Sequence, residues 1–383
     1  MGRKRKFREI APRAVATAAA AVFVLIAASC DDAPIYARSS SWYRAARSPY
    51  AAVFEAVAEA ADGYVYAVGY VVDYSWQWYP VVCRYDGREF KEVYRAPYTY
   101  GNFDDVKAWR NTVWAAGGGN RRGAMRPVLV RFSGGVWQEI DVPAAVEDEV
   151  FKTVFPTGLD SCWVAGWKGV YTYDRGVWNK RFRKTSPGGL IAIGSRDAFV
   201  YMYKKMEEAA AVFVTDDGGS TWAEERVDLG SKLYRFDPGD PWVVMGGVGG
   251  KLYLAVALRP HEPPKGNKYL QYYAILSREP ALPGEGVYEI EMLAPKGAAE
   301  FNYLTPAAGG MAFRSRQEGF LVSINTSLAL VNGKWVPEEL GSPGPWGYYQ
   351  FEAIGAGRSN YWAVVTEIKG WPREFDYYLY RTR

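Results

Sequence analysis

The chain has 383 residues, with 46 Lys and Arg against 42 Asp and Glu, so its formal net charge is +4. Residues 1–29 hold six Lys or Arg and one Glu, which leaves the rest of the chain near −1 and removes any case for nucleic-acid binding. The single histidine, His261, argues against catalytic-triad and zinc chemistry.

Residues 1–29 are predicted to be a signal peptide rather than part of the fold. A basic start, from Arg3 to Arg8, precedes an apolar stretch at 14–28 that is too short for a comfortable membrane span. The stretch ends in Ala27-Ala28-Ser29-Cys30, which resembles a bacterial lipobox, although the commonest residue three before the cysteine is Leu. The resemblance implies a lipid on Cys30, a tether at 30–40, and a place on the extracytoplasmic side of a membrane in the bacterial cell envelope. An ordinary signal peptide or an uncleaved anchor is the alternative.

An aromatic-centred apolar phrase recurs seven times in the rest of the chain. Its central residues are Tyr66, Trp114, Trp163, Phe199, Tyr253, Phe320 and Trp362. The steps between them are 48, 49, 36, 54, 67 and 42 residues, a length that is typical of β-propeller blades. We therefore predict an all-β fold over residues 41–383, a seven-bladed β-propeller of four-stranded antiparallel blades.

Each repeat predicts the same order of strands and turns. A short strand such as 54–57 or 351–354 comes first, then a turn, the aromatic phrase and a variable loop. Tight turns rich in Gly and Asn, within 84–87, 131–137, 173–178 and 331–335, predict hairpins between the third and fourth strands.

The fourth repeat carries a specific turn motif, Thr215-Asp216-Asp217-Gly218-Gly219-Ser220-Thr221-Trp222. Thr215, Asp217, Gly219, Thr221 and Trp222 match the Asp-box, Ser/Thr-x-Asp-x-Gly-x-Thr-Trp, of bacterial neuraminidase (BNR) repeats. Over residues 41–383 the chain resembles BNR and photosystem II assembly factor-like propellers at the level of the repeat. We expect Asp217 to accept hydrogen bonds from turn amides, and Trp222 to pack on the neighbouring blade.

The seventh repeat ends one strand short, and a spare strand lies upstream of the first repeat. We predict that residues 41–46, with Trp42, pair with 377–382 and complete the last blade, which removes two exposed sheet edges. Cys83 and Cys162 fall in repeats one and three, so we expect buried thiols rather than a disulfide.

Unequal loops between second and third strands are the candidate binding surface, because long loops on a rigid scaffold often carry binding residues. Aromatic and basic side chains there suit a glycan, a peptide or an anionic group. The alternative is tolerated variation in loop length. The candidate residues are Tyr74, Trp76, Trp78, Arg121, Arg122, Arg126, His261, Lys265, Trp371 and Arg373.

Four first strands share a polar residue directly after a Phe at 54, 103, 151 or 351. These residues are Glu55, Asp104, Lys152 and Glu352. Together with neighbouring acids such as Asp105, they are predicted to ring the mouth of the central channel. A cation or ligand could bind there, or the residues could form a solvated rim.

The sequence favours a non-catalytic binding or assembly scaffold for a protein or glycan. The alternative is a sialidase-like glycoside hydrolase acting at the centre of the propeller, which the resemblance to BNR repeats raises. Sialidases need three arginines, an acid/base Asp and a Tyr–Glu pair, and Phe54-Glu55-Ala56-Val57 departs from their usual Phe-Arg-Ile-Pro segment. A third possibility is an assembly factor with a basic patch on one face. No cofactor and no metal are predicted, and we expect a monomeric ring.

Overall fold

In this computed structural model the chain divides into two units, residues 1–37 and residues 38–383. The structure describes residues 38–39, 42–48, 52–146, 150–183, 189–192, 194–204, 209–227, 229, 234–236, 243–261, 272–295, 310–323, 326–339, 348–369 and 374–382. The described residues form strands and turns, and they include no helix long and apolar enough to cross a membrane.

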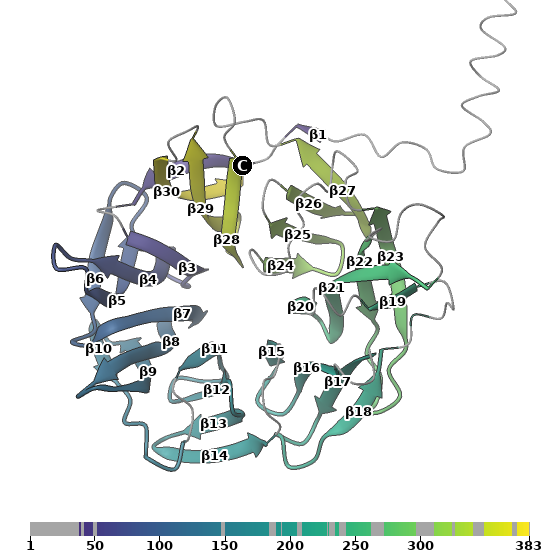
Figure 1. Ribbon diagram of the computed structural model, residues 1–383, viewed down its shortest axis with the longest axis horizontal. Coiled ribbons are helices and arrows are strands. Elements are labelled where there is room, and N and C mark those ends of the chain that lie inside the picture. The colour runs from purple at the N-terminus through teal and green to yellow at the C-terminus, as the bar shows by residue number, and fades with distance from the viewer. Residues whose placement is uncertain are drawn as a thin grey trace, which may run out of the picture. The chain divides into compact units, whose positions relative to one another are not determined.

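Seven antiparallel sheets are arranged in a ring (Figure 1), which confirms the predicted seven-bladed propeller. Blade 1 contains β3 (Ala52–Glu59), β4 (Val65–Val72), β5 (Trp78–Tyr85) and β6 (Phe90–Arg95). Blade 2 contains β7 (Thr99–Trp109), β8 (Thr112–Arg121), β9 (Ala124–Ser133) and β10 (Val136–Glu139). Blade 3 contains β11 (Phe151–Pro156), β12 (Ser161–Gly166), β13 (Val170–Asp174) and β14 (Val177–Phe182). Blade 4 contains β15 (Gly189–Ala192), β16 (Ala198–Lys204), β17 (Ala209–Thr215) and β18 (Ala223–Arg226).

The remaining blades depart from this plan in small ways. Blade 5 contains β19 (Tyr234–Phe236), β20 (Val243–Val248), β21 (Lys251–Pro260), β22 (Tyr272–Arg278) and β23 (Tyr288–Pro295). Both β19 and β20 pair with β21, so the innermost strand is divided. Blade 6 contains β24 (Gly310–Ser315), β25 (Glu318–Ser323), β26 (Thr326–Val331) and β27 (Lys334–Glu339). A short strand, β1 (Arg38–Ser39), pairs in parallel with β27, in a region that the sequence assigned to the tether.

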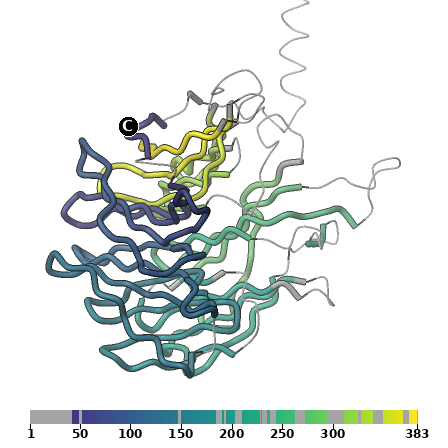
Figure 2. The backbone as a smooth tube through the Cα atoms, turned by 60° about the vertical axis from the view of Figure 1, so that its left-hand side comes forward, coloured from purple at the N-terminus to yellow at the C-terminus, as the bar shows by residue number. Residues whose placement is uncertain are grey.

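Blade 7 closes the ring with the N-terminal strand. It contains β28 (Tyr348–Ala356), β29 (Tyr361–Lys369), β30 (Glu374–Thr382) and β2 (Trp42–Arg47). Trp42 pairs with Thr382 and Arg44 with Tyr380, as predicted, and the pairing extends one residue beyond the predicted strand, to Arg47 with Tyr378. Figure 2 shows this purple strand beside the yellow C-terminal strands. Arg44 of β2 is half-exposed, and its Nε donates to Oε1 of the buried Glu367 on β29 at 2.5 Å.

The recurring aromatic phrase forms the second strand of every blade, where its ring packs against a neighbouring blade. Tyr66 contacts Trp137 of blade 2 at 6.2 Å between ring centroids, and Trp163 contacts Trp222 of blade 4 at 6.3 Å. Around the closure, Trp362 contacts Tyr85 of blade 1 at 5.9 Å. The aromatic residue of the sequence repeat therefore makes an equivalent contact between neighbouring blades in each repeat.

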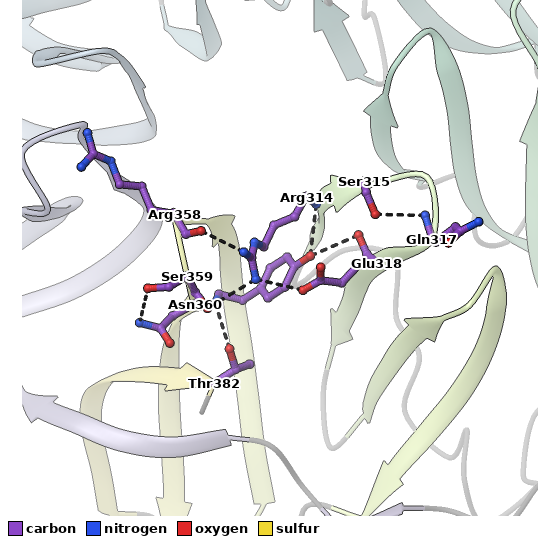
Figure 3. A network of polar contacts seen from close by, with 9 residues as sticks. Arg314, Ser315, Gln317, Glu318, Arg358, Ser359, Asn360 and Thr382 are labelled. Carbon is purple, nitrogen blue, oxygen red and sulfur yellow. Dashed lines mark hydrogen bonds and ion pairs between the residues drawn. The ribbon is translucent and has the colours of Figure 1, made fainter.

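Polar contacts also join the blades. Figure 3 shows Arg314 of blade 6, whose Nη2 donates to the Arg358 carbonyl of blade 7 at 2.9 Å. The Tyr361 hydroxyl accepts from the Arg314 amide and donates to the Glu318 carbonyl, each at 3.1 Å. These bonds hold blade 7 against blade 6 beside the closing strand.

A buried ion pair joins blades 4 and 5. Arg278 Nε and Nη2 donate to the two carboxylate oxygens of Glu225 at 2.6 Å each. The Glu225 carboxylate also accepts from the Tyr288 hydroxyl at 3.0 Å and from the Gly284 amide at 3.0 Å. Almost every polar atom of this pair therefore has a partner, which is what a buried charge requires.

Cys83 and Cys162 are buried free thiols, as predicted. Burial raises the pKa of the Cys83 thiol to about 12 and raises that of Cys162 further. Both thiols are therefore unreactive at neutral pH.

Candidate binding site at the mouth of the central cavity

Four consecutive blades, 7, 1, 2 and 3, carry the same irregularity in the innermost strand. A buried Phe pairs with the second strand, the next residue has no partner there, and the pairing then resumes. The unpaired residues are Glu352, Glu55, Asp104 and Lys152. Such a β-bulge re-aims a side chain, and bulges are common beside functional sites. All four residues line the central cavity.

At three of the four bulges the Phe pairs with a glycine, and at two of these the backbones of the paired strands approach very closely. Phe54 pairs with Gly69 and Phe103 pairs with Gly117. A Cβ on Gly69 would lie 1.9 Å from the Val53 carbonyl oxygen, and one on Gly117 would lie 2.0 Å from that of Asn102. Only a residue without a side chain permits this close approach of the two backbones.

The cavity at the centre of the ring has a volume of about 1080 Å³, large enough for a small ligand. Its walls differ in chemistry. Blades 7, 1, 2 and 3 supply the charged bulge residues, whereas blades 4, 5 and 6 supply mainly apolar side chains. These are Leu190, Ile191, Val244, Met245, Met311 and Phe313. The cavity therefore has one charged side and one apolar side.

The three carboxylates are partly desolvated and lie near one another. Burial raises the pKa of Glu55 to about 7, with repulsion from Glu352 and Asp104 adding to the effect and Lys152 opposing it. Burial also raises the pKa of Glu352, against hydrogen bonds from Gln350 at 3.1 Å and Thr366 at 2.9 Å. Glu55 is therefore a carboxyl that changes charge near neutral pH.

Asp104 and Lys152 form an ion pair on the same side of the cavity. Lys152 Nζ donates to Asp104 Oδ1 at 2.6 Å. Burial raises the pKa of Asp104, and Lys152 and Asn102 oppose that rise. The other carboxylate oxygen, Asp104 Oδ2, is buried without a hydrogen-bond partner in the described structure. Lys152 also lies 5.5 Å from the centre of the half-exposed Trp167 ring, a cation–π contact.

Two tyrosines that the sequence did not single out lie beside the carboxylates. Burial raises the pKa of Tyr70, and the charges of Glu55 and Glu352 raise it further. Burial, Tyr70 and Glu352 likewise raise the pKa of Tyr377. Tyr70 lies on β4 and Tyr377 lies on β30, and neither strand is the innermost one of its blade. The two residues therefore share no position in the repeat that would indicate them from the sequence. The Tyr70 ring stacks on Trp78 at 5.5 Å, which connects the cavity to a predicted loop residue.

The candidate loops and the bulges lie at the same end of the blades. In blade 1 the start of β3 pairs with the end of β4, since Ala52 is opposite Val71, and the loop after β4 follows directly. In blade 2 Thr99 is likewise opposite Asn120, just before the turn at Arg122. The loops between second and third strands therefore surround the cavity mouth.

The blade 1 loop presents aromatic side chains to solvent. Tyr74 and Trp76 are fully or largely exposed and Trp78 is half-exposed. The Asp73 carboxylate accepts from the amides of Ser75 at 2.8 Å and Gln77 at 2.9 Å, which defines the tip of the loop. Trp76 has a φ of 59°, a conformation that is uncommon for a bulky residue, and the residue is 80% exposed.

The basic loop candidates differ in their surroundings. Arg121 is occupied, since it pairs with Glu139 at 2.7 Å and lies 4.4 Å above the Tyr98 ring. Arg122, in a tight turn with a φ of 53°, and Arg126 are exposed. His261 is exposed at the end of β21. Cys30, Lys265, Trp371 and Arg373 lie outside the described residues.

The Asp-box turn lies between β17 and β18, at the opposite end of the blade from the cavity mouth. Asp217 accepts hydrogen bonds from the amides of Ser220 at 2.9 Å and Thr221 at 3.0 Å. These bonds, with those from the Thr221 and Thr215 hydroxyls, hold the pKa of Asp217 well below its usual range. Gly219 has a φ of 78°, and Trp222 Nε1 donates to the Arg181 carbonyl of blade 3 at 2.9 Å. The turn connects two blades and is remote from the candidate site.

The described cavity lining contains lysines but no arginine, so the arginine triad that a sialidase needs is not among these residues. The same part of the chain contains no group of three or more His, Cys, Asp or Glu residues placed to hold a metal ion.

No family model and no curated protein matches the chain. Three similar solved structures are the polysaccharide lyase Uly1, the β-propeller domain of the Trilobed protease from Pyrococcus furiosus, and Sqt1 from Chaetomium thermophilum. Uly1 is 11% identical with a TM-score of 0.49, and the match covers 90% of this chain and 92% of that one. The protease domain is 10% identical with a TM-score of 0.47, covering 86% and 95%. Sqt1 is 10% identical with a TM-score of 0.45, covering 88% and 99%. Likenesses this distant do not indicate an activity or a ligand.

Proposed function

We propose that this protein is an exported, lipid-anchored binding propeller that captures a protein or glycan on the loop face, with part of the ligand entering the central cavity. One observation carries the proposal. Bulges in four consecutive blades direct Glu352, Glu55, Asp104 and Lys152 at a single cavity, and that cavity opens among the exposed aromatic loops. Partly desolvated charges that converge in a cavity are typical of binding and active sites.

The proposed anchor is a lipid on Cys30, supported by the basic, apolar and small-residue segments that precede it. A single acyl chain binds membranes only weakly, so stable anchoring needs more than one chain or a further contact. Cys30→Ser should release the protein from the membrane fraction without changing its unfolding temperature. Retention of the Cys30→Ser protein in that fraction would argue for an uncleaved anchor.

Partner capture tests the binding role directly. The full protein is cross-linked in cells, and species recovered with the wild type are compared with those recovered with Trp76→Ser and with Glu55→Gln plus Glu352→Gln. We expect both variants to lose the same species. Val177→Ala, at an exposed residue at the opposite end of blade 3, is the matched control. A species captured equally by all four proteins would contradict the proposal.

Glycoside hydrolysis is a second candidate function, because a carboxyl with a pKa of about 7 beside a second carboxylate is the pairing of a general acid and its partner. Glu55 would protonate the leaving group and Glu352 would act on the opposite face of the sugar. Aryl glycosides test this role. Aglycone release by the wild type that Glu55→Gln abolishes would establish it, and no release across a panel of sugars would exclude it for those sugars.

A further inference from the structure

The proposed function leaves the chemistry of the ligand open, and the charges of the cavity narrow it. The bulge residues supply three carboxyl groups, Glu55, Glu352 and Asp104, and one ammonium, Lys152. That ammonium is already paired with Asp104 Oδ1 at 2.6 Å. Within the described part of the chain, neither Glu55 nor Glu352 forms an ion pair of this kind. The charged wall therefore carries an excess of negative charge.

The opposite wall adds a second requirement. The side chains of blades 4, 5 and 6 there are mainly apolar, with Met245, Met311 and Phe313 among them. A hydrated inorganic cation gains nothing from such a wall, and the described acids are not placed to bind a metal ion. The described cavity lining carries five carboxyl groups and two ammonium groups, Lys107 and Lys152, and these two are already paired with Asp105 and Asp104. An anionic ligand would therefore meet an excess of negative charge.

We propose that the cavity binds a cationic group on an apolar stem, a primary ammonium or guanidinium whose charge lies against Glu55, Glu352 and Asp104 while its stem contacts the apolar wall. This inference rests on the proposed function and names the class of ligand. Asp104, whose side chain is 14% exposed and already accepts from Lys152 Nζ at 2.6 Å, contributes negative charge to this wall rather than a free acceptor. Trp167, half-exposed at the mouth, gives the stem or the cation an aromatic face.

Binding of a cation should be linked to proton release. The groups that face Glu55 are Glu352, Asp104, Lys152 and Tyr70, and burial with the two carboxylates raises the pKa of Glu55 to about 7. A bound cation favours the ionised carboxylate, so binding lowers that pKa and releases a proton near neutral pH. Affinity should therefore rise between pH 6 and pH 8, by up to about tenfold if one group is fully linked.

Calorimetry on the full protein tests the inference with two probes of nearly equal shape. Nα-acetyl-lysine amide carries the ammonium, and Nα-acetyl-norleucine amide is its neutral counterpart. We expect only the first to bind, with proton release detected as a dependence of the heat on the ionisation enthalpy of the buffer. Glu55→Gln should weaken binding at pH 8 and flatten the pH dependence.

Two further variants separate a charge effect from damage to the fold. Lys152→Met removes the competing ammonium, so it should raise the affinity for the lysine probe several-fold. Glu89→Gln changes an exposed acid of the turn between β5 and β6 and should leave binding unchanged. Equal binding of the two probes, or no binding of the lysine probe, would overturn the inference.

Different results would overturn the cationic ligand and the proposed binding function. A neutral chito-oligosaccharide that binds in place of the lysine probe, with its binding lost in Glu352→Gln, would overturn the cationic ligand and leave the binding role intact. Partner capture that ignores every cavity and loop variant would remove the binding role itself.

Discussion

Glu225 of blade 4 and Arg278 of blade 5 form an ion pair through two hydrogen bonds of 2.6 Å, with side chains that are 0% and 1% exposed. The pair lies between two blades, and blade 5 is the one whose inner strand is divided into β19 and β20. A satisfied charge pair fixes the relative position of the two sheets more narrowly than apolar packing alone.

Removal of one partner of this pair should be strongly destabilising. Arg278→Met leaves a buried carboxylate, and we expect a loss of about 3–5 kcal/mol in the free energy of unfolding. Replacing both residues, as in Glu225→Leu with Arg278→Met, should recover much of that loss. Urea unfolding measures both values. Glu92→Gln, in a more exposed pair with Arg95, should change stability by less than about 1 kcal/mol and is the control.

Glu55 should make the stability of the fold fall as pH rises. Its pKa is about 7 in the folded protein against 4.5 for an unperturbed Glu, so the folded state holds more protons between these values. The contribution of Glu55 is therefore fully present below about pH 4.5 and lost above about pH 7, a change of about 3 kcal/mol. Glu55→Gln should match the wild type at pH 4 and exceed it at pH 8 in thermal unfolding. The assignment would be contradicted if the stability of the wild type did not fall between these pH values, or if Glu55→Gln did not remove that fall.

Gly69 should resist replacement even by alanine. A Cβ there would lie 1.9 Å from the Val53 carbonyl oxygen, so the bulge at Glu55 must shift or the strands must separate. We expect Gly69→Ala to cost about 1–3 kcal/mol and to weaken ligand binding at the cavity. At Gly194 the nearest atom to an added methyl group would be a carboxylate oxygen of Asp197 at 3.8 Å, so Gly194→Ala is a matched control that should be nearly neutral. Chemical denaturation compares the two variants.

Trp42 should be a major stabilising residue of the closing strand. Its side chain is 8% exposed, lies 5.3 Å from the Phe320 ring, and donates from Nε1 to Ser327 Oγ at 2.9 Å. Trp42→Ala should cost about 3–5 kcal/mol, and Trp42→Phe should cost less because it keeps an aromatic ring. Differential scanning calorimetry gives both shifts. A Trp42→Ala protein as stable as the wild type would mean that β2 adds little to the ring.

The architecture could be predicted because its signals are local. The aromatic phrase marks one strand per blade, and Gly–Asn turns mark the hairpins, so seven blades and the closing role of Trp42 follow from the sequence. The shared position of Glu55, Asp104, Lys152 and Glu352 after a Phe is also local, and all four reach the cavity because each occupies a bulge.

The remaining features depend on contacts between distant segments. Tyr377 approaches Glu352 from another strand of blade 7, and nothing in the spacing indicates it. Arg121, predicted as a binding residue, instead forms an ion pair with Glu139 of β10 and a cation–π contact with Tyr98, just before β7. Glu225 and Arg278 are 53 residues apart, and the pairing of β1 with β27 spans most of the chain. Sequence patterns report strand and turn propensity, whereas these partners are set by how the blades pack.

The pairing of Trp42 with Thr382 joins a strand that is synthesised early to one that is synthesised much later. β2 has no partner strand in blade 7 until β30 has been made, so blade 7 cannot be completed before then. A truncated or nicked chain that lacks β30 would keep two open strand edges, which can pair with another copy of the chain. The pairing of β2 with β30 thus protects the ring from self-association, because neither strand can leave the blade without exposing the edge of the other.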